Sequence, residues 1–476
     1  MNHVNLAISR GSDEPLPITR GRLLDFPDDP IACLRALHQQ HGNVCALEED
    51  GQRIYFVFGP EFNHQVLSDG VNFHSQFFAI RGARHSSQRR LSSGLLSMNG
   101  EQHKRNRRLV MDAFMKKAIL NYIPTIKAEV EAMLGEWVPG AERDISRDMT
   151  DFMLRLTSSI LFGIDQPEVA YKIGHMIDHW VHLNHELGMG AFVADQTIAN
   201  RYDELLTEAN ELEREILGMI RMRKANSTGN DALSILINAH DGQGSISDDE
   251  LVGQAALMFA AAHLTTAHSL TWTLFLLAQH PSAMTQLHNE LSTHLDGRFP
   301  TLEQVEKLSF TERAIKESMR VLPASSYSQR TTASHVDLGP FKLAPGAGII
   351  FSQFVTHHMP HLYADPEAYL PDRWLKITPT PYQYLPFGAG PRMCLGASLA
   401  MLILKTTVPT VLQRFKLTVV PNSEVSGKVI STMLGATTSV RMRVDHQDGR
   451  FECHPVRGNI HQMVDLREIK SVRRAA

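Results

Sequence analysis

The sequence has few cysteines and no spacing that would pair them. Its 476 residues include four, at Cys33, Cys45, Cys394 and Cys453, and none belongs to a CxxC pair. This argues against a zinc site built on cysteine. It also argues against a disulfide scaffold, because such scaffolds are short and dense in cysteine. We infer a reducing compartment and expect a cytoplasmic protein.

The chain also lacks a dominant charge and an apolar run at its beginning. The formal net charge is -4, which gives no global signal for nucleic acid. The first 30 residues predict neither a signal peptide nor a membrane anchor. The most apolar stretch, 251–278, is interrupted by histidines and hydroxyl residues, which indicates a helix buried in protein rather than in lipid.

Helical periodicity dominates the middle of the sequence. Ser247 and Glu250 form a capping-box signature at the start of the apolar stretch, and Pro281 marks its end. The resulting helix has about 33 residues and a length of ~50 Å. A helix so long and apolar is expected to run through the middle of the fold. A hairpin is predicted at 43–58. With no internal repeat or low-complexity linker, we predict one large, mainly α domain with small β-sheets.

A glycine-rich segment around Cys394 is where the sequence points to chemistry. It reads FGAGPRMCLG from Phe387 to Gly396. Its glycines permit tight turns. A cysteine where a loop becomes a helix is stabilised as a thiolate by backbone N–H groups and the helix dipole. Arg392 can neutralise a carboxylate through a forked hydrogen bond. The alternative is an inert, buried cysteine, but the combination of glycines and arginine favours a metal ligand.

This segment resembles the haem-binding signature of the cytochrome P450 family, F-x-x-G-x-R-x-C-x-G, at every defined position. The resemblance implies the P450 fold, with haem b between the long central helix and the loop that carries Cys394. It implies that Cys394 is the axial ligand of the iron. The resemblance implies four further residues at the haem: Phe387, Gly388, Gly396 and Ala262. Gly396 would leave room for the flat macrocycle.

Two other sets of residues match the same family. Glu317 and Arg320, three apart on a predicted helix, indicate by themselves only a surface ion pair. With Arg373, the resemblance implies a Glu–Arg–Arg network that fixes the loop before the cysteine. The second set is expected to bind the haem propionates: His103, Arg107, Arg330 and Arg392. The alternative for the first two is a solvated basic face. Neighbouring charges could instead dock an acidic electron carrier: Lys104, Arg105, Arg108, Lys116 and Lys117.

The central helix departs from the family pattern. The family's [AG]-G-x-[DE]-T-[TS] corresponds to AAHLTT at 261–266. Thr265 and Thr266 are the candidate catalytic residues, because a hydroxyl there can hydrogen-bond dioxygen or the water that protonates it. Leu264 replaces the acid and cannot relay a proton. Protons could come from His263 or His268, from substrate or from a water chain, or the enzyme could use peroxide or couple radicals. For His263, a satisfied core histidine is preferred to a relay.

The resemblance covers about 28–444. It implies a single monooxygenase domain there, with an N-terminal arm at 1–27 and a C-terminal extension at 445–476 that is either a disordered arm or a partner contact. The expected activity is insertion of one oxygen atom from O2 into a small or medium organic substrate. No flavin or nicotinamide domain fits, so a ferredoxin or flavodoxin with its reductase is expected to supply electrons. No partnership with nucleic acid or membrane is expected.

The segment 74–97 matches the part of the family that roofs the haem pocket. It contains Phe77 and Phe78 but also several basic residues, among them Arg81, Arg84 and Arg90. These would either recognise an acidic or polar end of the substrate or face water. Two rival functions stay open: a non-catalytic haem sensor, and a histidine-rich metal protein using His357, His358 and His361.

Overall fold

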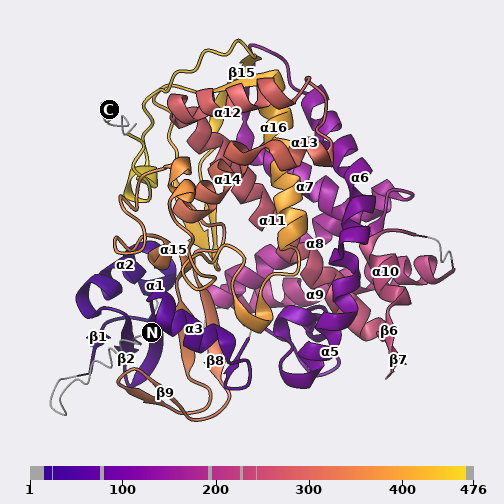
Figure 1. Cartoon of the computed structure of the whole chain (residues 1–476). Coiled ribbons are helices and arrows are strands. Elements are labelled where there is room, and N and C mark those ends of the chain that lie inside the picture. Colours follow the sequence, from indigo (N-terminus) through magenta and orange to yellow (C-terminus); the bar gives the residue numbers. More distant parts are fainter. Residues whose placement is uncertain are drawn as a thin grey trace, which may run out of the picture.

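The structure is a computed structural model that describes residues 16–23, 25–75, 80–190, 196–225, 229–242 and 244–467. Helices form most of it, and the largest sheet lies at one corner (Figure 1). The longer helices are α2 (Pro30–His41), α3 (Gly59–Ser68), α5 (Gly100–Met111), α6 (Lys116–Gly135), α7 (Ile145–Phe162), α8 (Pro167–Gly190), α9 (Gln196–Ala225), α11 (Asp248–Gln279), α12 (Pro281–His294), α14 (Ser309–Val321) and α16 (Ala397–Arg414). The shorter ones are α1 (Asp25–Asp28), α4 (Ser87–Leu91), α10 (Ala232–Asn238), α13 (Leu302–Lys307) and α15 (Gln353–His357).

The central helix α11 forms as the sequence predicts. Ser247 and Glu250 make the reciprocal capping box at its first turn, and the helix ends at Gln279, before Pro281. From Ser269 to Gln279 it is buried on every side, so its neighbours form a continuous shell around that part. It packs most extensively on α7 and also contacts α4, α8, α9, α14 and α16. The model therefore confirms a mainly helical fold around one long buried helix.

The sheets are small and lie outside the helical core. The largest has the strand order β1-β2-β3-β11-β8-β4. Asp50 and Gly51, both at positive φ, form the two-residue loop of the predicted β2–β3 hairpin. The strands of this sheet are β1 (Ile18–Arg20), β2 (Val44–Glu49), β3 (Gln52–Val57), β4 (Phe73–His74), β8 (Ser328–Thr332) and β11 (Gly348–Phe351).

The remaining strands make three two-stranded sheets and one three-stranded sheet. They are β6 (His240–Asp241) with β7 (Gly244–Ser245), β9 (Val336–Leu338) with β10 (Phe341–Leu343), β13 (Gly427–Ile430) with β14 (Met433–Ala436), and the three-stranded sheet of β12 (Phe415–Val419), β15 (Arg441–His446) and β5 (Glu142–Asp144).

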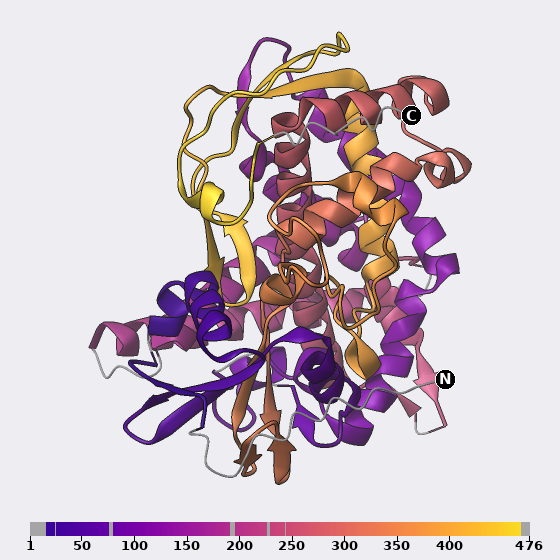
Figure 2. The ribbon, with the colours of Figure 1, turned by 60° about the vertical axis from the view of Figure 1, so that its left-hand side comes forward.

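Both ends of the described chain belong to the fold. Residues 1–15 of the predicted arm lie outside the described residues, but β1 pairs with β2 and Phe26 is buried. The segment after β15 runs along one side of the molecule (Figure 2). Its residues Ile460, Met463 and Val464 are buried in the main core. Up to Arg467, this segment is therefore packed against the core rather than free.

Candidate functional site

The loop before α16 is closed by backbone contacts that hold Cys394 in place. The N–H of Cys394 donates to the carbonyl of Phe387 at 2.9 Å. Gly388 and Gly390 have φ of 66° and 70°, where L side chains are strained. A Cβ at Gly390 would lie 2.3 Å from the carbonyl oxygen of Leu67, so only glycine fits. The predicted need for glycine at these turns thus has a steric cause.

The Cys394 side chain is exposed although the residue lies deep in the fold. Burial raises the pKa of its thiol, against the opposing effects of the Gly396 N–H, the charge of Arg107 and the Ala397 N–H. These donors point at the sulfur and favour its anionic form, which is the form that binds a metal. Gly396 is the N-cap residue of α16, and a Cβ there would stand 3.9 Å from Sγ.

Three arginines and a histidine from distant segments share one region beside this loop. Arg107 on α5 donates to the carbonyl of Met393 at 2.7 Å. Arg392 donates to Asn99 Oδ1 at 2.6 Å. Burial and the charges of Arg392, Arg107 and Arg330 lower the pKa of His103 to about 4.

No carboxylate forms an ion pair with any of these four groups among the described residues. Burial and the charge of Arg392 lower the pKa of Arg330 to about 10, and burial with the charge of Arg107 does the same for Arg392. Three gathered, partly buried guanidinium groups without an anion of their own, beside the neutral imidazole of His103, are the chemistry of a site for two carboxylates of a ligand.

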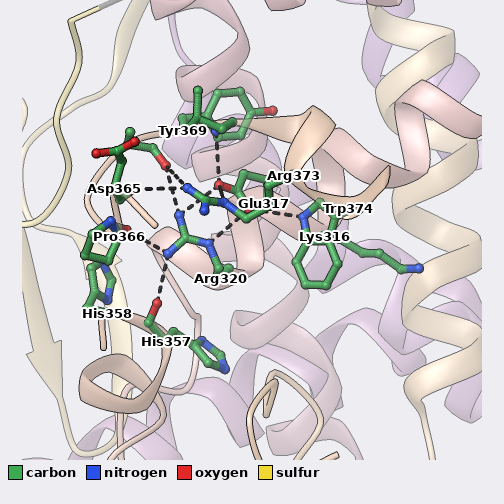
Figure 3. Close-up of polar contacts among 12 residues, drawn as sticks. Lys316, Glu317, Arg320, His357, His358, Asp365, Pro366, Tyr369, Arg373 and Trp374 are labelled. Atoms are coloured by element: carbon green, nitrogen blue, oxygen red, sulfur yellow. Dashed lines mark hydrogen bonds and ion pairs between the residues drawn. The ribbon is translucent and has the colours of Figure 1, made fainter. Parts of the chain in front are cut away.

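The Glu–Arg–Arg network is fully formed and buried (Figure 3). Glu317 and Arg320 on α14 have no exposed side-chain surface. The Glu317 carboxylate accepts two hydrogen bonds from Arg320 at 2.8 and 3.0 Å, and others from Arg373 Nε at 2.9 Å, Trp374 Nε1 at 3.0 Å and the Leu370 N–H at 3.0 Å. Burial raises the pKa of Glu317, but the charge and hydrogen bonds of Arg320, the charge of Arg373 and the Leu370 N–H together outweigh it, so the net shift is downward. These are contacts of a structural clamp, as expected from the resemblance.

The clamp reaches the loop before the cysteine through backbone carbonyls. Arg320 donates to the carbonyls of His357 at 2.8 Å, Pro366 at 2.7 Å and Ala368 at 2.9 Å. The ring of His357 in turn accepts the N–H of Leu385 at 2.8 Å. The sequence did not single out His357 for this role, because nothing in a His-His pair indicates which carbonyl or N–H it will meet. His358 stacks on Phe354 beside it, 4.2 Å between ring centroids.

The central helix presents Thr265 on its accessible face and hides Thr266. Thr265, Ala261, Ala262 and Leu264 all keep accessible surface, whereas Thr266 is 6% exposed and turned into the core. The Thr265 hydroxyl donates to the carbonyl of Ala261 at 2.7 Å. The leucine that replaces the family's acid thus faces the same space as the threonine.

His263 lies on the opposite side of α11. It is 2% exposed, and its Nε2 lies 3.2 Å from the carbonyl of Thr150 and its Nδ1 3.3 Å from Asp178 Oδ1 on α8. Burial raises the pKa of Asp178, but the hydrogen bond and charge of His263 and the charges of nearby histidines outweigh it, so the net shift is downward. The preferred interpretation, a satisfied core histidine, agrees with these contacts.

Several basic residues form ion pairs with acidic residues of the same chain. Arg90, in the roof segment, pairs with Glu213 on α9, and Arg105 pairs with Asp241 at 3.2 Å. Lys104 pairs with Glu101 at 2.7 Å. The roof residues Phe77 and Phe78 lie outside the described residues. Three basic residues near α5 are exposed and form no ion pair with the described residues: Arg108, Lys116 and Lys117.

The donors present suit a haem. A sulfur beneath aimed N–H groups could supply an axial ligand, and the cluster of arginines could supply partners for two propionates. In the described part of the chain, no group of three or more His, Cys, Asp or Glu residues is arranged to hold a metal. None of its helices is long and apolar enough to cross a membrane.

Comparison with known proteins agrees with this donor set. A model of the family described as Cytochrome P450 matches residues 12–440. The chain belongs to the cytochrome P450 family. It is 31% identical to Cyclooctatin synthase of Streptomyces melanosporofaciens over 86% of this chain and 90% of that relative. It is 27% identical to Pentalenene oxygenase of Streptomyces avermitilis over 83% and 88%.

The P450 fold is also evident from a solved structure. The chain superposes on a retinoic acid-bound cyanobacterial CYP120A1 with a TM-score of 0.78 and 22% identity, covering 91% of this chain and all of the other. Another relative, Cyclooctat-9-en-7-ol 5-monooxygenase of Streptomyces melanosporofaciens, is 31% identical over 83% and 86%. The protein is thus a P450 monooxygenase, an oxidoreductase whose family uses a haem-thiolate cofactor.

Proposed function

We propose that this P450 monooxygenase oxidises an apolar, terpene-like substrate, with haem b held by Cys394 and electrons delivered by a ferredoxin or flavodoxin and its reductase. The substrate class rests on the names of the relatives, two of which refer to oxygenation of pentalenene and of cyclooctat-9-en-7-ol. The observation that carries the proposal is the pairing of Cys394 beneath its N–H donors with the cations beside it.

Different residues of the chain would ligate the iron, bind the propionates and pack on the haem. Bound haem would supply the iron that activates dioxygen, and donation from a thiolate favours cleavage of the O–O bond. Cys394 would ligate the iron, and His103, Arg107, Arg330 and Arg392 would hold the propionates. The haem would pack on Phe387, Gly388, Gly396 and Ala262.

Thr265, rather than the buried Thr266, would act on the distal side. Its hydroxyl hydrogen is already donated to the Ala261 carbonyl, so Oγ1 is left to accept a hydrogen bond from a water molecule and hold it above the haem. Beyond its first turn, α11 carries no carboxylate, so none stands beside Thr265 on its accessible face. The proton must therefore travel through water or substrate to that held water.

The electron carrier would dock on the exposed cations near α5. Arg108, Lys116 and Lys117 form a basic surface that suits an acidic protein. Because exposed charges are screened within about 8–10 Å at ordinary ionic strength, reduction of the haem by such a carrier should slow as salt rises.

The test combines a spectrum with turnover. The reduced carbon monoxide complex of the holoprotein should absorb far to the red, and Cys394→Ser should lose that band. With a ferredoxin, its reductase and reduced nicotinamide, the protein should add one oxygen atom to members of a terpene panel. A holoprotein with the red-shifted band that oxidises none of them would refute the substrate class, and an unshifted band would refute the ligand.

A peroxide-driven reaction is the second candidate, and Leu264 on the accessible face favours it. Hydrogen peroxide already carries both protons that the usual route must deliver. Faster product formation with peroxide than with the electron carriers, at equal haem concentration, would support this candidate.

A further inference from the structure

Beyond its first turn, the accessible residues of α11 form one broad stripe. Between Leu251 and Gln279, accessible surface remains on seven residues: Met258, Ala260, Ala261, Ala262, Leu264, Thr265 and His268. At about 100° per residue, Ala261, Thr265 and His268 fall on nearly one line, and the others flank it. His263 points about 200° away from Thr265. Of the two histidines considered as proton sources, His268 is the one that shares the threonine's face.

Only two members of the stripe are polar, and one is already engaged. Thr265 gives its hydroxyl hydrogen to Ala261 within the helix. The other five members are alanines, a leucine and a methionine. On this wall of the site, His268 is therefore the side chain left to offer a hydrogen bond. Binding sites for apolar ligands characteristically carry a few placed polar groups on an apolar wall, and these set the orientation of the ligand.

The His268 ring is seated against a strand. A Cβ at Gly435 of β14 would lie 2.6 Å from both Cε1 and Nε2 of the ring, so the ring lies directly on the strand backbone. Nδ1 is buried without a hydrogen-bond partner, whereas Nε2 is not among the buried, unpartnered atoms of the described residues. Nε2 is thus the nitrogen that reaches accessible surface.

The ring carries one proton, and the surroundings select its position. Burial, with the charge of His263, lowers the pKa of His268 to about 4, so the imidazole is neutral near pH 7. A neutral imidazole has one N–H donor and one bare nitrogen. A buried N–H without an acceptor is rarer than an unsatisfied acceptor. The proton therefore belongs on Nε2, pointing out from the helix.

We propose that His268 binds an oxygen atom already present on the substrate, through a hydrogen bond donated by Nε2, and so orients the substrate over Thr265. This deepens the proposed function and rests on it: the preferred substrate is a terpene-like alcohol or ketone rather than the parent hydrocarbon. The enzyme would follow a reaction that introduces a hydroxyl or carbonyl group into an apolar skeleton.

The experiment compares matched ligands. The holoprotein is titrated with a panel of mono-, sesqui- and diterpene alcohols and ketones and with their parent hydrocarbons, following the shift of the haem absorption band and the heat of binding. Wild type should bind at least one oxygenated member more tightly than its hydrocarbon. His268→Phe, which keeps a planar ring without a donor, should weaken that ligand by about 3–10-fold and leave the hydrocarbon within twofold.

Two further variants separate the hydrogen bond from packing. His268→Gln, which retains an N–H donor, should recover part of the preference. Gly435→Ala should reduce the preference while keeping the imidazole, because the new methyl displaces the ring. Equal weakening of both ligands in His268→Phe would overturn the proposal, as would a panel in which no oxygenated member outbinds its hydrocarbon. The carbon monoxide spectrum of each variant tests the haem site separately. A normal spectrum with no preference for the oxygenated ligand would therefore refute the role of His268 and leave the proposed haem ligation intact.

Discussion

The Nε2 atom of His357 accepts a hydrogen bond from the backbone N–H of Leu385 at 2.8 Å. The carbonyl of the same residue accepts from Arg320, and the carbonyl of Leu385 accepts from Gly388 N at 3.0 Å. One residue therefore joins the buried clamp to the loop that carries Cys394. The bond requires an unprotonated ring nitrogen, and burial together with the charge of Arg320 lowers the pKa of His357 to about 3.

This link predicts a loss of stability in mild acid. Between pH 6.5 and about 3 the unfolded chain binds a proton at His357 that the native state does not, so the free energy of unfolding falls as pH falls. For one such histidine the loss from pH 7 to pH 5 is about 2 kcal/mol. His357→Phe should start less stable but lose about that much less over the same interval. Urea unfolding at both pH values measures the difference; parallel losses in the two proteins would contradict it.

Removing the central arginine should disable the haem site. Arg320→Ala leaves the buried Glu317 carboxylate without its main partner, a change that costs on the order of 3–5 kcal/mol. We expect the variant to contain little or no haem. The matched control is Arg313→Ala on the same helix, whose ion pair with Asp372 is partly exposed and does not involve Glu317. The ratio of haem to protein measures the effect, and a normal haem spectrum in Arg320→Ala would refute the assignment.

Removing an arginine from the cluster at His103 should have opposite effects on haem affinity and on the stability of the apoprotein. Arg330→Met would remove one of the proposed propionate partners, so haem affinity should fall by about 10–100-fold. It also removes a charge that burial and Arg392 disfavour, so the apoprotein should unfold at an equal or higher temperature than wild-type apoprotein. Arg441→Met, at an exposed ion pair with Glu142, should change neither quantity. A destabilised apoprotein would indicate a purely structural arginine.

Features that depend on residues close together in the sequence could be predicted from it, whereas contacts between distant segments could not. The capping box of α11 and the Asp50-Gly51 hairpin were predicted correctly because each depends on residues within a few positions. The cluster around His103 was reached only through resemblance, since its members come from separate segments. His357 was missed as a link because its partner, Leu385, lies 28 residues away. Leu264 was noticed, yet only the fold shows which histidine shares its face.

Restoring an acid on the central helix should improve coupling. Leu264→Asp places a titratable group on the accessible face next to Thr265, where the family carries one. We expect more product per reduced nicotinamide consumed and less peroxide released than in wild type. Leu264→Asn has nearly the same shape without an acidic proton and should not improve coupling. Near-complete coupling in the wild type would show that the missing acid is unimportant.

The C-terminal segment should stabilise the clamp as well as the core. The Asp465 N–H donates to the carbonyl of Glu367 at 2.9 Å, beside Ala368, whose carbonyl accepts from Arg320. Ile460 is wholly buried, so Ile460→Ala should lower the free energy of unfolding by about 2–5 kcal/mol.

Gln462, two positions after Ile460, provides the control. Gln462 is exposed, so Gln462→Ala should change stability by less than about 0.5 kcal/mol. A chain that stops after Asp448 loses both the buried side chains and the contact with Glu367. We therefore expect it to retain less haem, measured after a chase with apomyoglobin. Retention equal to that of the full chain would mean that the clamp holds without this segment and that its burial serves the core alone.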